Sequence, residues 1–349
     1  MAHLSRSDER EQTVTDVLLD TVDCPEDGDQ VLIVDDTTGR LDLLDGKGAI
    51  LHRWARYGVS AQSWPEGGPF DMATLRLNRD RDAFDMSLHA VLSLLKPGGS
   101  LWIYGANDEG MKSLPKRLKT LVESCELVDM RRRCRVLRVE RPALIPSLRV
   151  SISQWARDLE LPLPSGTRAW KSYPGLFAKG SLDPATEALM RVLPTPSAGS
   201  RVLDFASGPG ALSAELIARE PNLRLAMLDH DALALTAARE NVPGASYLQS
   251  NSWHRPPGRH RWDLIVSNPP VHKGRSQNLE VLEDLIAGAP MRLSQGGSLW
   301  FVALGHLPVT AMVEDAFDDR VSIAWQGPRF KVWHCQTSDE QEPSTSSWS

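Results

Sequence analysis

The chain has 349 residues, of which 41% are hydrophobic and 24% charged, and its formal net charge is −6. This length suits about two domains of roughly 100–200 residues each, and the composition excludes collagen-like, low-complexity and wholly disordered proteins. The four cysteines stand far apart without a CxxC pair, which argues against a disulfide scaffold or a zinc ribbon and favours a reducing cytoplasm. No signal peptide is visible, and no apolar run approaches the roughly 18 residues that a membrane span needs.

The amino-terminal half begins with segments typical of strands that alternate with helices. Residues 29–35 (DQVLIVD) and residues 70–73 (FDMA) are short apolar runs, and residues 96–102 (KPGGSLW) lead from a helix through a turn into a further strand. Residues 142–172 come next and are rich in proline, a composition that suits a linker between two domains.

The carboxy-terminal half repeats this plan with sharper patterns. Short strands are predicted over residues 200–205, 223–228, 245–249, 262–266 and 298–303, and helices over residues 211–219, 231–240 and 279–293. Asp231 is a candidate N-cap of the second of these helices. Strands that alternate with helices predict an α/β protein with a parallel, doubly wound sheet.

Two windows indicate that the halves are copies of one fold. Residues 96–102 (KPGGSLW) and 294–300 (SQGGSLW) share five identical residues at the same place of a helix-turn-strand unit. We therefore expect two tandem Rossmann-like domains, residues 1–141 and 173–337, and then a disordered tail over residues 338–349. The loops of the first copy lack the chemistry of the second, so we expect the first copy to be degenerate.

The first loop of the second copy carries a candidate ligand site. Asp204, Ala206, Ser207, Gly208 and Gly210 lie after a predicted strand and before a predicted helix. The glycines let the backbone approach a ligand, and the helix N-terminus presents free N–H groups. A GxGxxG or GxxxxGK[ST] pattern is missing, which argues against a dinucleotide fold and a P-loop. Taken alone, the loop is also compatible with an ordinary tight turn.

Two further residues extend this site towards a cofactor that contains ribose. Asp229 ends the second strand, where a carboxylate can accept hydrogen bonds from both ribose hydroxyls. A helix cap or surface turn is the alternative, and Asp231 competes for that part. Asn251 comes after the strand predicted over residues 245–249 and is a candidate for the edge of an adenine.

Asn268, Pro269 and Pro270 come directly after the strand predicted over residues 262–266, at the edge where open α/β sheets bind ligands. Each proline favours an extended backbone in the residue before it, so the turn is rigid. The Asn268 side chain and an outward backbone carbonyl could accept both hydrogens of a planar amino group. An ordinary proline turn would explain these three residues if they stood alone. It is a poor explanation in a chain where a glycine-bearing loop and Asp229 come at the ends of the preceding strands.

The order and spacing of these segments resemble class I S-adenosylmethionine-dependent methyltransferases that methylate amino groups. More narrowly, the chain resembles the bacterial ribosomal RNA guanine-N2 methyltransferases of the RsmC/RlmG type, in which a degenerate domain precedes an active one. Residues 174–183 (PGLFAKGSLD), 267–274 (SNPPVHKG) and 327–332 (GPRFKV) carry the resemblance together with the loop and Asp229. It is strong from about residue 173 to 333 and weak before residue 141.

The resemblance implies S-adenosyl-L-methionine as the cofactor, no metal, and methylation of guanine N2 in ribosomal RNA, with 16S RNA expected first. Asn268 and Pro269 would bind the amino group in the turn that Pro270 completes, catalysis would be mostly positioning, and the base would flip out of its stack. The alternatives are a 23S guanine-N2 methyltransferase, an enzyme for adenine N6 or a protein glutamine, and an inactive cofactor-binding protein of ribosome assembly.

Two positions depart from the family pattern. The first loop is usually glycine-cysteine-glycine, and residues 206–208 are Ala-Ser-Gly here, small enough to retain the cofactor. The residue after the two prolines is usually aromatic, and Val271 lacks a stacking contact worth about 1–3 kcal/mol. We expect Val271, His272 and Phe177 to form the base pocket, and Trp253 is a candidate substitute for the aromatic ring.

A basic stretch qualifies the acidic net charge. Residues 111–141 contain ten Lys or Arg against four Asp or Glu. Such clusters are commonly solvated faces, but beside a degenerate domain an RNA-docking or supporting role is favoured. The candidate RNA contacts are Arg131, Arg132, Arg133 and Lys273. We expect a cytoplasmic monomer that acts on ribosomal RNA or a ribosomal subunit, without membrane or metal.

Overall fold

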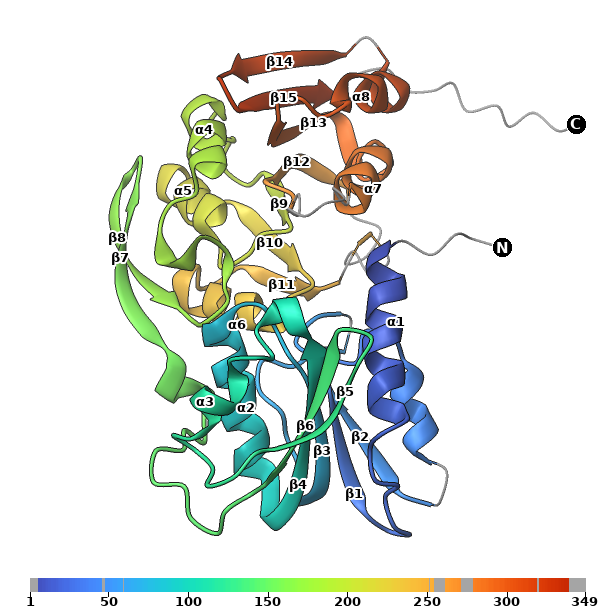
Figure 1. Ribbon diagram of the computed structural model, residues 1–349. Coiled ribbons are helices and arrows are strands. Elements are labelled where there is room, and N and C mark those ends of the chain that lie inside the picture. The colour runs from blue at the N-terminus through green and yellow to red at the C-terminus, as the bar shows by residue number, and fades with distance from the viewer. Residues whose placement is uncertain are drawn as a thin grey trace, which may run out of the picture. The chain divides into compact units, whose positions relative to one another are not determined.

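The computed structural model describes residues 6–45, 48–58, 60–250, 252–253, 261–270, 279–318 and 320–338 (Figure 1). The chain divides into two compact units, the first made of residues 1–56 and 62–156 and the second of residues 57–61 and 157–349. None of the helices in the described ranges is long and apolar enough to cross a membrane.

A mixed sheet forms the centre of the first unit, with the strand order β2-β1-β3-β4-β6-β5 over the described residues. β1 to β4 are parallel, and β6 and β5 are antiparallel to their neighbours. The elements are α1 (Arg6–Leu19), β1 (Gln30–Val34), η1 (Arg40–Asp45), β2 (Ile50–Trp54), β3 (Phe70–Arg76), α2 (Arg81–Leu94), β4 (Leu95–Ala106), η2 (Asn107–Glu109), α3 (Leu114–Leu118), β5 (Glu126–Arg131), β6 (Cys134–Glu140) and η3 (Ile152–Trp155).

Both faces of this sheet are buried, which explains why its strands are almost continuously apolar. Along β1, Leu32 and Val34 pack with apolar side chains of α2 and α3, whereas Val31 and Ile33 pack with those of α1. Successive side chains of a strand point to opposite faces, so one short strand contributes to two hydrophobic cores.

The second unit contains a longer sheet with the described strand order β11-β10-β9-β12-β13-β15-β14, in which β11 to β13 are parallel and β15 and β14 antiparallel. A separate hairpin joins β7 (Arg157–Leu163) to β8 (Gly166–Ser172). The other elements are η4 (Phe177–Gly180), α4 (Pro184–Val192), β9 (Arg201–Phe205), α5 (Ala211–Arg219), β10 (Arg224–Asp229), α6 (Ala232–Asn241), β11 (Ser246–Gln249), β12 (Trp262–Ser267), α7 (Glu280–Gly288), β13 (Leu293–Leu304), α8 (Val309–Phe317), β14 (Val321–Gln326) and β15 (Phe330–Gln336).

Two cores cover the faces of the second sheet as well. One contains Leu203 and Phe205 of β9 with side chains of α7 and α8, and the other contains Val202 with side chains of α4, α5, α6 and the hairpin. The predicted doubly wound α/β sheet is therefore confirmed, but it is mixed and not wholly parallel, because β15 and β14 run antiparallel to their neighbours. The carboxyl ends of its parallel strands carry the loops after β9, β10 and β12.

The two units share their topology, which confirms the predicted duplication. Their strand orders agree when β11, which has no counterpart among the described residues of the first unit, is left out. Each has a register shift at the same place, between Phe70 and Met72 and between Trp262 and Leu264. At both shifts a glycine passes close to backbone, because a Cβ on Gly99 or Gly297 would lie 2.9 or 2.8 Å from a carbonyl oxygen.

Several predicted boundaries differ from the structure. The helix predicted over residues 279–293 ends at Gly288, because Pro290 cannot continue a helix, and β13 already begins at Leu293. The predicted linker over residues 142–172 is only partly irregular: residues 157–172 form the β7–β8 hairpin and belong to the second unit. Of the tail predicted over residues 338–349, only Ser338 lies within the described residues.

Candidate active site

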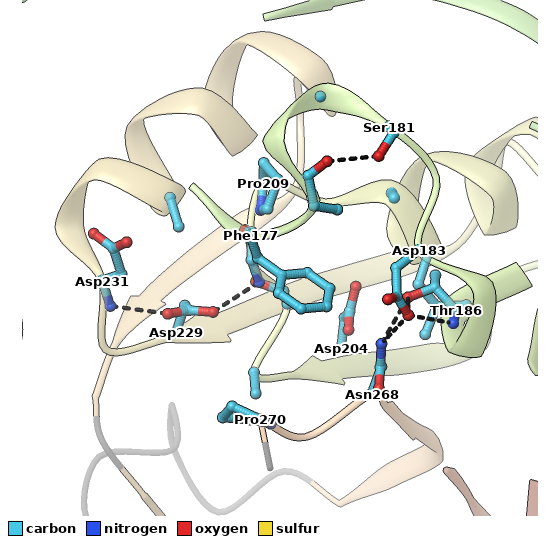
Figure 2. A pocket seen from close by; sticks show the side chains of 18 of the residues that line it. Phe177, Ser181, Asp183, Thr186, Asp204, Pro209, Asp229, Asp231, Asn268 and Pro270 are labelled. Atoms are coloured by element: carbon cyan, nitrogen blue, oxygen red, sulfur yellow. Dashed lines mark hydrogen bonds between the residues drawn. The ribbon is translucent and has the colours of Figure 1, made fainter. Parts of the chain in front are cut away.

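The loops after β9, β10 and β12 line a cavity of about 550 Å³ in the second unit, together with residues from the segment that precedes and begins α4 (Figure 2). This volume lies within the usual range of about 300–1,000 Å³ for small-molecule sites. Of the residues predicted for the cofactor site, Asp204, Ala206, Ser207, Gly208 and Asp229 line it. The topology thus brings together side chains from separate strands at the edge where the sequence analysis placed them.

The loop after β9 has a backbone that only small residues adopt readily. Ala206, Gly208 and Gly210 all have positive φ angles, of 56°, 55° and 98°. A Cβ on Gly210 would lie 2.7 Å from Cε of Met227, whereas one on Gly208 would face open space. Gly210 is therefore required mainly by its φ angle, and Gly208 leaves room for a ligand to approach the backbone.

Asp229 connects this loop to the next one. Its Oδ2 accepts a hydrogen bond from the N–H of Gly208 at 2.7 Å, and its Oδ1 accepts one from the N–H of Asp231 at 2.8 Å. Asp231 in turn caps α6 by accepting from the N–H of Leu233 at 2.9 Å, which confirms its predicted role. The Asp229 carboxylate is buried at the cavity wall in a fixed orientation.

Asp204 lies deeper, with 1% of its surface exposed. The hydroxyl of Ser213 donates to its Oδ2 at 2.6 Å. Burial raises the pKa of the Asp204 carboxyl to about 7, and this outweighs the opposing effect of the Ser213 hydrogen bond, while the nearby Asp229 adds to the increase. A group that titrates near neutral pH thus lies in the wall of the cavity.

Asn268 comes after β12 and is held by α4. Its Nδ2 donates to Oδ2 of Asp183 at 3.0 Å and to Oγ1 of Thr186 at 2.8 Å (Figure 2). One residue earlier, the hydroxyl of Ser267 donates to the carbonyl of Phe205 at 2.6 Å, which joins β12 to the end of β9. The predicted turn therefore presents a side chain of defined orientation to the cavity.

A second cavity, of about 480 Å³, adjoins the first at this turn. Phe177, Asp183, Asn268 and Pro270 line both cavities, and Pro269 lines the second. The second cavity is otherwise mostly apolar, with Pro184, Ala185, Val302, Ala303, Leu304, Arg329 and Phe330. Asn268 thus lies where two ligand-sized spaces meet.

Some predicted site residues cannot be placed in this way. Asn251, Val271, His272 and Lys273 lie outside the described residues. Trp253 is in the hydrophobic core, where its ring lies 4.6 Å from that of Phe205, so its expected role as a substitute base-stacking residue is wrong.

The three arginines predicted to contact RNA belong to the first unit, and they differ in their ion pairs and backbone positions. Arg131 forms ion pairs of 2.9 Å with both Asp20 and Asp129. Arg132 and Arg133 form the turn between β5 and β6 with positive φ angles and are exposed. The basic stretch is therefore partly neutralised by acidic residues.

The site also contains residues that the sequence analysis missed. Asp183 and Thr186 contact Asn268, and the ring of Tyr57 lines the first cavity and stacks on His230 with centroids 5.2 Å apart. Asp183 before Pro184 is a recognisable helix start, but that pattern does not indicate which side chain the cap will meet. Tyr57 belongs to a short segment, residues 57–61, that lies almost 100 residues before the rest of the second unit in the sequence. No local pattern could therefore have assigned it to this site.

The equivalent place in the first unit is filled by an ion-pair network. In the shared register, Arg76 of the first unit is equivalent to Asn268 of the second unit. The buried guanidinium binds Glu11 and Glu109, each at 2.8 Å. Burial lowers the pKa of Arg76, but the hydrogen bonds to Glu11 and Glu109 outweigh burial and raise it. The first unit is degenerate in the sense that a buried ion-pair network stands where the second unit has Asn268.

The fold and the site of the second unit define a class I S-adenosylmethionine-dependent methyltransferase: a mixed sheet of this order, a glycine-bearing loop after β9, an acid at the end of β10 and Asn-Pro-Pro after β12. Residues 168–334 match the methyltransferase small domain, and residues 46–158 match the methyltransferase small domain N-terminal family. In the described residues, no group of three or more His, Cys, Asp or Glu could hold a metal ion.

Curated relatives give the particular family. The chain is 31% identical over 261 residues to the ribosomal RNA small subunit methyltransferase C of Pectobacterium atrosepticum, covering 73% of this chain and 71% of that one. It is 36% identical over 256 residues to the protein of the same name from Chromohalobacter salexigens, covering 70% and 72%. The chain belongs to the ribosomal RNA small subunit methyltransferase C family.

A solved structure has the same fold over nearly the whole chain. The 16S rRNA N2 methyltransferase (RsmC) of T. thermophilus, in complex with AdoMet and guanosine, has a TM-score of 0.82 and 24% sequence identity, and the match covers 93% of this chain and 92% of that one. The order of strands and helices along the chain is therefore that of a known methyltransferase fold.

Proposed function

We propose that this protein transfers the methyl group of S-adenosyl-L-methionine to the exocyclic N2 amine of a guanine in the 16S RNA of the small ribosomal subunit. The observation that carries the proposal is the position of Asn268, at the meeting point of two cavities in a chain of this family. Relatives named as small-subunit RNA methyltransferases and a fold neighbour with guanosine bound support this choice of substrate.

The first cavity suits the cofactor. Its wall offers the carboxylates of Asp204, Asp229 and Asp231, and its loop leaves open space beside Gly208. Asp229 is placed at a strand end where a carboxylate accepts from ribose hydroxyls. The acidic wall complements the positive charge of the sulfonium and ammonium groups. When bound, the cofactor supplies the activated methyl group.

The second cavity suits the base. Phe177 and Phe330 line it and provide aromatic surface where Val271 provides none. The side-chain oxygen of Asn268 and the carbonyl of Pro269 would accept from the amino group, which localises the nitrogen lone pair that the ring otherwise delocalises. A base inside a helix cannot reach such a site, so the nucleotide must be flipped out.

The rest of the chain would serve to bring ribosomal RNA to this site. Arg132 and Arg133 are our candidate phosphate contacts in the first unit, and Lys273 and His272 remain candidates next to the Asn-Pro-Pro turn. We further propose that the protein acts as a monomer, in the cytoplasm, where ribosomal subunits are assembled. In this arrangement residues 1–141 dock or support the RNA and residues 173–337 catalyse the transfer.

The test is methyl transfer from labelled S-adenosyl-L-methionine to under-methylated small subunits, large subunits and free 16S RNA. We expect label in the small subunit and, after digestion, in N2-methylguanosine. Label only in the large subunit, in N6-methyladenosine or in protein would contradict the proposed substrate. Cofactor binding without any transfer would indicate the inactive assembly protein instead.

The Asn268→Ala variant tests the role of the Asn268 side chain in the same assay. We expect it to lower transfer at least about 100-fold, because the variant loses an interaction with the reacting amino group. The dissociation constant for the cofactor, measured by calorimetry, should change less than about threefold. Wild-type turnover in this variant would contradict the role of Asn268.

A further inference from the structure

Two residues outside the Asn-Pro-Pro turn hold the Asn268 side chain. The amide nitrogen Nδ2 of Asn268 donates to Asp183 Oδ2 at 3.0 Å and to Thr186 Oγ1 at 2.8 Å. Both acceptors come from the start of α4, where Asp183 is the N-cap and Thr186 is 6% exposed. Figure 2 shows the three side chains directed towards one another beside the cavity.

This arrangement determines which end of the amide faces the cavity. A carboxylate oxygen accepts hydrogen bonds and cannot donate them. Asp183 Oδ2 already accepts from the N–H groups of Ala185 and Thr186, at 2.9 and 3.0 Å, and lies 3.4 Å from the Thr186 hydroxyl. An amide turned by half a rotation would set its own oxygen against this acceptor, so the observed orientation is strongly favoured.

Over the described residues, Nδ2 donates both hydrogen bonds of the Asn268 side chain, so Oδ1 is the atom that would accept from a ligand. An amino group such as guanine N2 presents only N–H donors in its plane, which an oxygen receives and an NH₂ group repels. The direction of the Asn268 amide is thus a condition for binding the acceptor amine.

We propose that Asp183 and Thr186 are positioning residues that orient the Asn268 amide so that its oxygen selects and holds the amino group to be methylated. This inference rests on the proposed function, since guanine N2 is the amine that the site would receive. The inference gives α4 a role in the site. Residues at the start of this helix determine whether the nitrogen or the oxygen of the Asn268 amide faces the ligand.

Two matched pairs of variants separate this role from folding. Thr186→Val keeps the shape of the side chain and removes the acceptor, whereas Thr186→Ser keeps a hydroxyl. Asp183→Ser retains an N-cap for α4 but is too short to reach Asn268, whereas Asp183→Asn retains both the cap and an accepting oxygen. The disruptive and the conservative member of each pair should have the same unfolding midpoint within about 2 °C.

The first measurement is steady-state transfer to small subunits. We expect kcat to fall about tenfold or more in Thr186→Val and Asp183→Ser, because the freed amide can rotate, and to stay within about threefold of wild type in Thr186→Ser and Asp183→Asn. The cofactor dissociation constant should be equal within each pair, because the two Thr186 variants keep the charge at that position and the two Asp183 variants both remove it. Equal kcat values within the Thr186 pair would overturn the inference.

The second measurement needs no turnover. Binding of guanosine and of inosine, which lacks the 2-amino group, is compared in full-length protein loaded with S-adenosylhomocysteine. We expect wild type to bind guanosine more tightly than inosine. The ratio of the two dissociation constants should be about fivefold smaller in Thr186→Val than in Thr186→Ser. Wild type that prefers guanosine but methylates no subunit would contradict the proposed function alone. Wild type without the preference, or Thr186→Val with the full preference, would overturn the positioning role.

Discussion

At the scale of single residues, Asp204 is a group in the cavity wall whose pKa is raised well above its ordinary value. Burial raises its pKa to about 7, and Asp229 adds to this increase. In the unfolded chain an aspartate titrates near 3.9. Between these two values the folded protein binds more protons than the unfolded chain, so the contribution of Asp204 to stability is present below about pH 4 and is lost as the pH rises to about 7.

We therefore expect the free energy of unfolding of wild type, relative to Asp204→Asn, to fall by up to about 4 kcal/mol between pH 4 and pH 7 and to level off above it. Urea unfolding of the two proteins across this range is the measurement, with ligand absent. A difference that does not vary with pH would show that Asp204 is already ionised in the folded protein.

Cofactor binding should be coupled to the same proton. A cationic ligand favours the ionised carboxylate, so we expect affinity for S-adenosyl-L-methionine to increase from pH 6 to pH 8 and binding at pH 6.5 to release a proton. Calorimetry in buffers of different ionisation enthalpy reports the proton count. Asp204→Asn should abolish the release, and an unchanged release in that variant would assign the proton to another group.

At the scale of elements, the two copies differ in the residues at the ends of equivalent strands. After β12 the chain presents Asn268 to two cavities, whereas at the end of β3 Arg76 forms ion pairs with Glu11 and Glu109. Burial raises the pKa of Glu109, but its hydrogen bond to Arg76 outweighs burial and lowers it. The first copy therefore has a stabilising buried ionic network at the position where the second copy has Asn268 beside the two cavities.

Arg76→Met should be strongly destabilising, because it leaves the buried Glu109 carboxylate without its closest partner. We expect a loss of about 3–5 kcal/mol in the free energy of unfolding, and a partial recovery in the double variant with Glu109→Gln. Hydrogen exchange of the β3 and β4 amides reports on the first unit specifically. Arg40→Met, which removes a solvent-accessible pair of 2.8 Å with Asp16, is the control and should cost less than about 1 kcal/mol.

At the scale of the whole molecule, the net charge of −6 conceals an uneven distribution. Part of the basic stretch is paired: Arg131 binds Asp20 and Asp129, and Arg117 binds Asp85. The turn between β5 and β6 instead exposes Arg132 and Arg133. The charges available to RNA are therefore fewer than the sequence suggests, and Arg132 and Arg133 are among those that stay exposed.

The double variant Arg132→Glu with Arg133→Glu should weaken RNA binding and reduce the slope of log K against log salt by about 2. Binding of a 16S RNA fragment at several salt concentrations is the measurement. The control reverses Arg201 and Arg224, at the amino ends of β9 and β10, and changes the net charge equally. Equal losses in both double variants would mean that overall charge, and not this turn, determines affinity.

The sequence by itself determined the duplicated α/β fold, the order of most elements and several of the residues that line the cavity. Period and turn signals are local, so residues such as Gly208, Asp229 and Asn268 could be placed at strand ends without coordinates. Boundaries failed where a local rule was weak, as in the helix that ends before Pro290.

Only the tertiary structure decided how those residues are supported. Asp183 and Thr186 lie more than 80 residues before Asn268, and their hydrogen bonds to it exist only because α4 packs beside β12's loop. The same holds for the buried Arg76 network, the pairing of Arg131 and the neutral-range pKa of Asp204. Burial and hydrogen-bond partners depend on three-dimensional packing, and a pattern along one chain does not contain them.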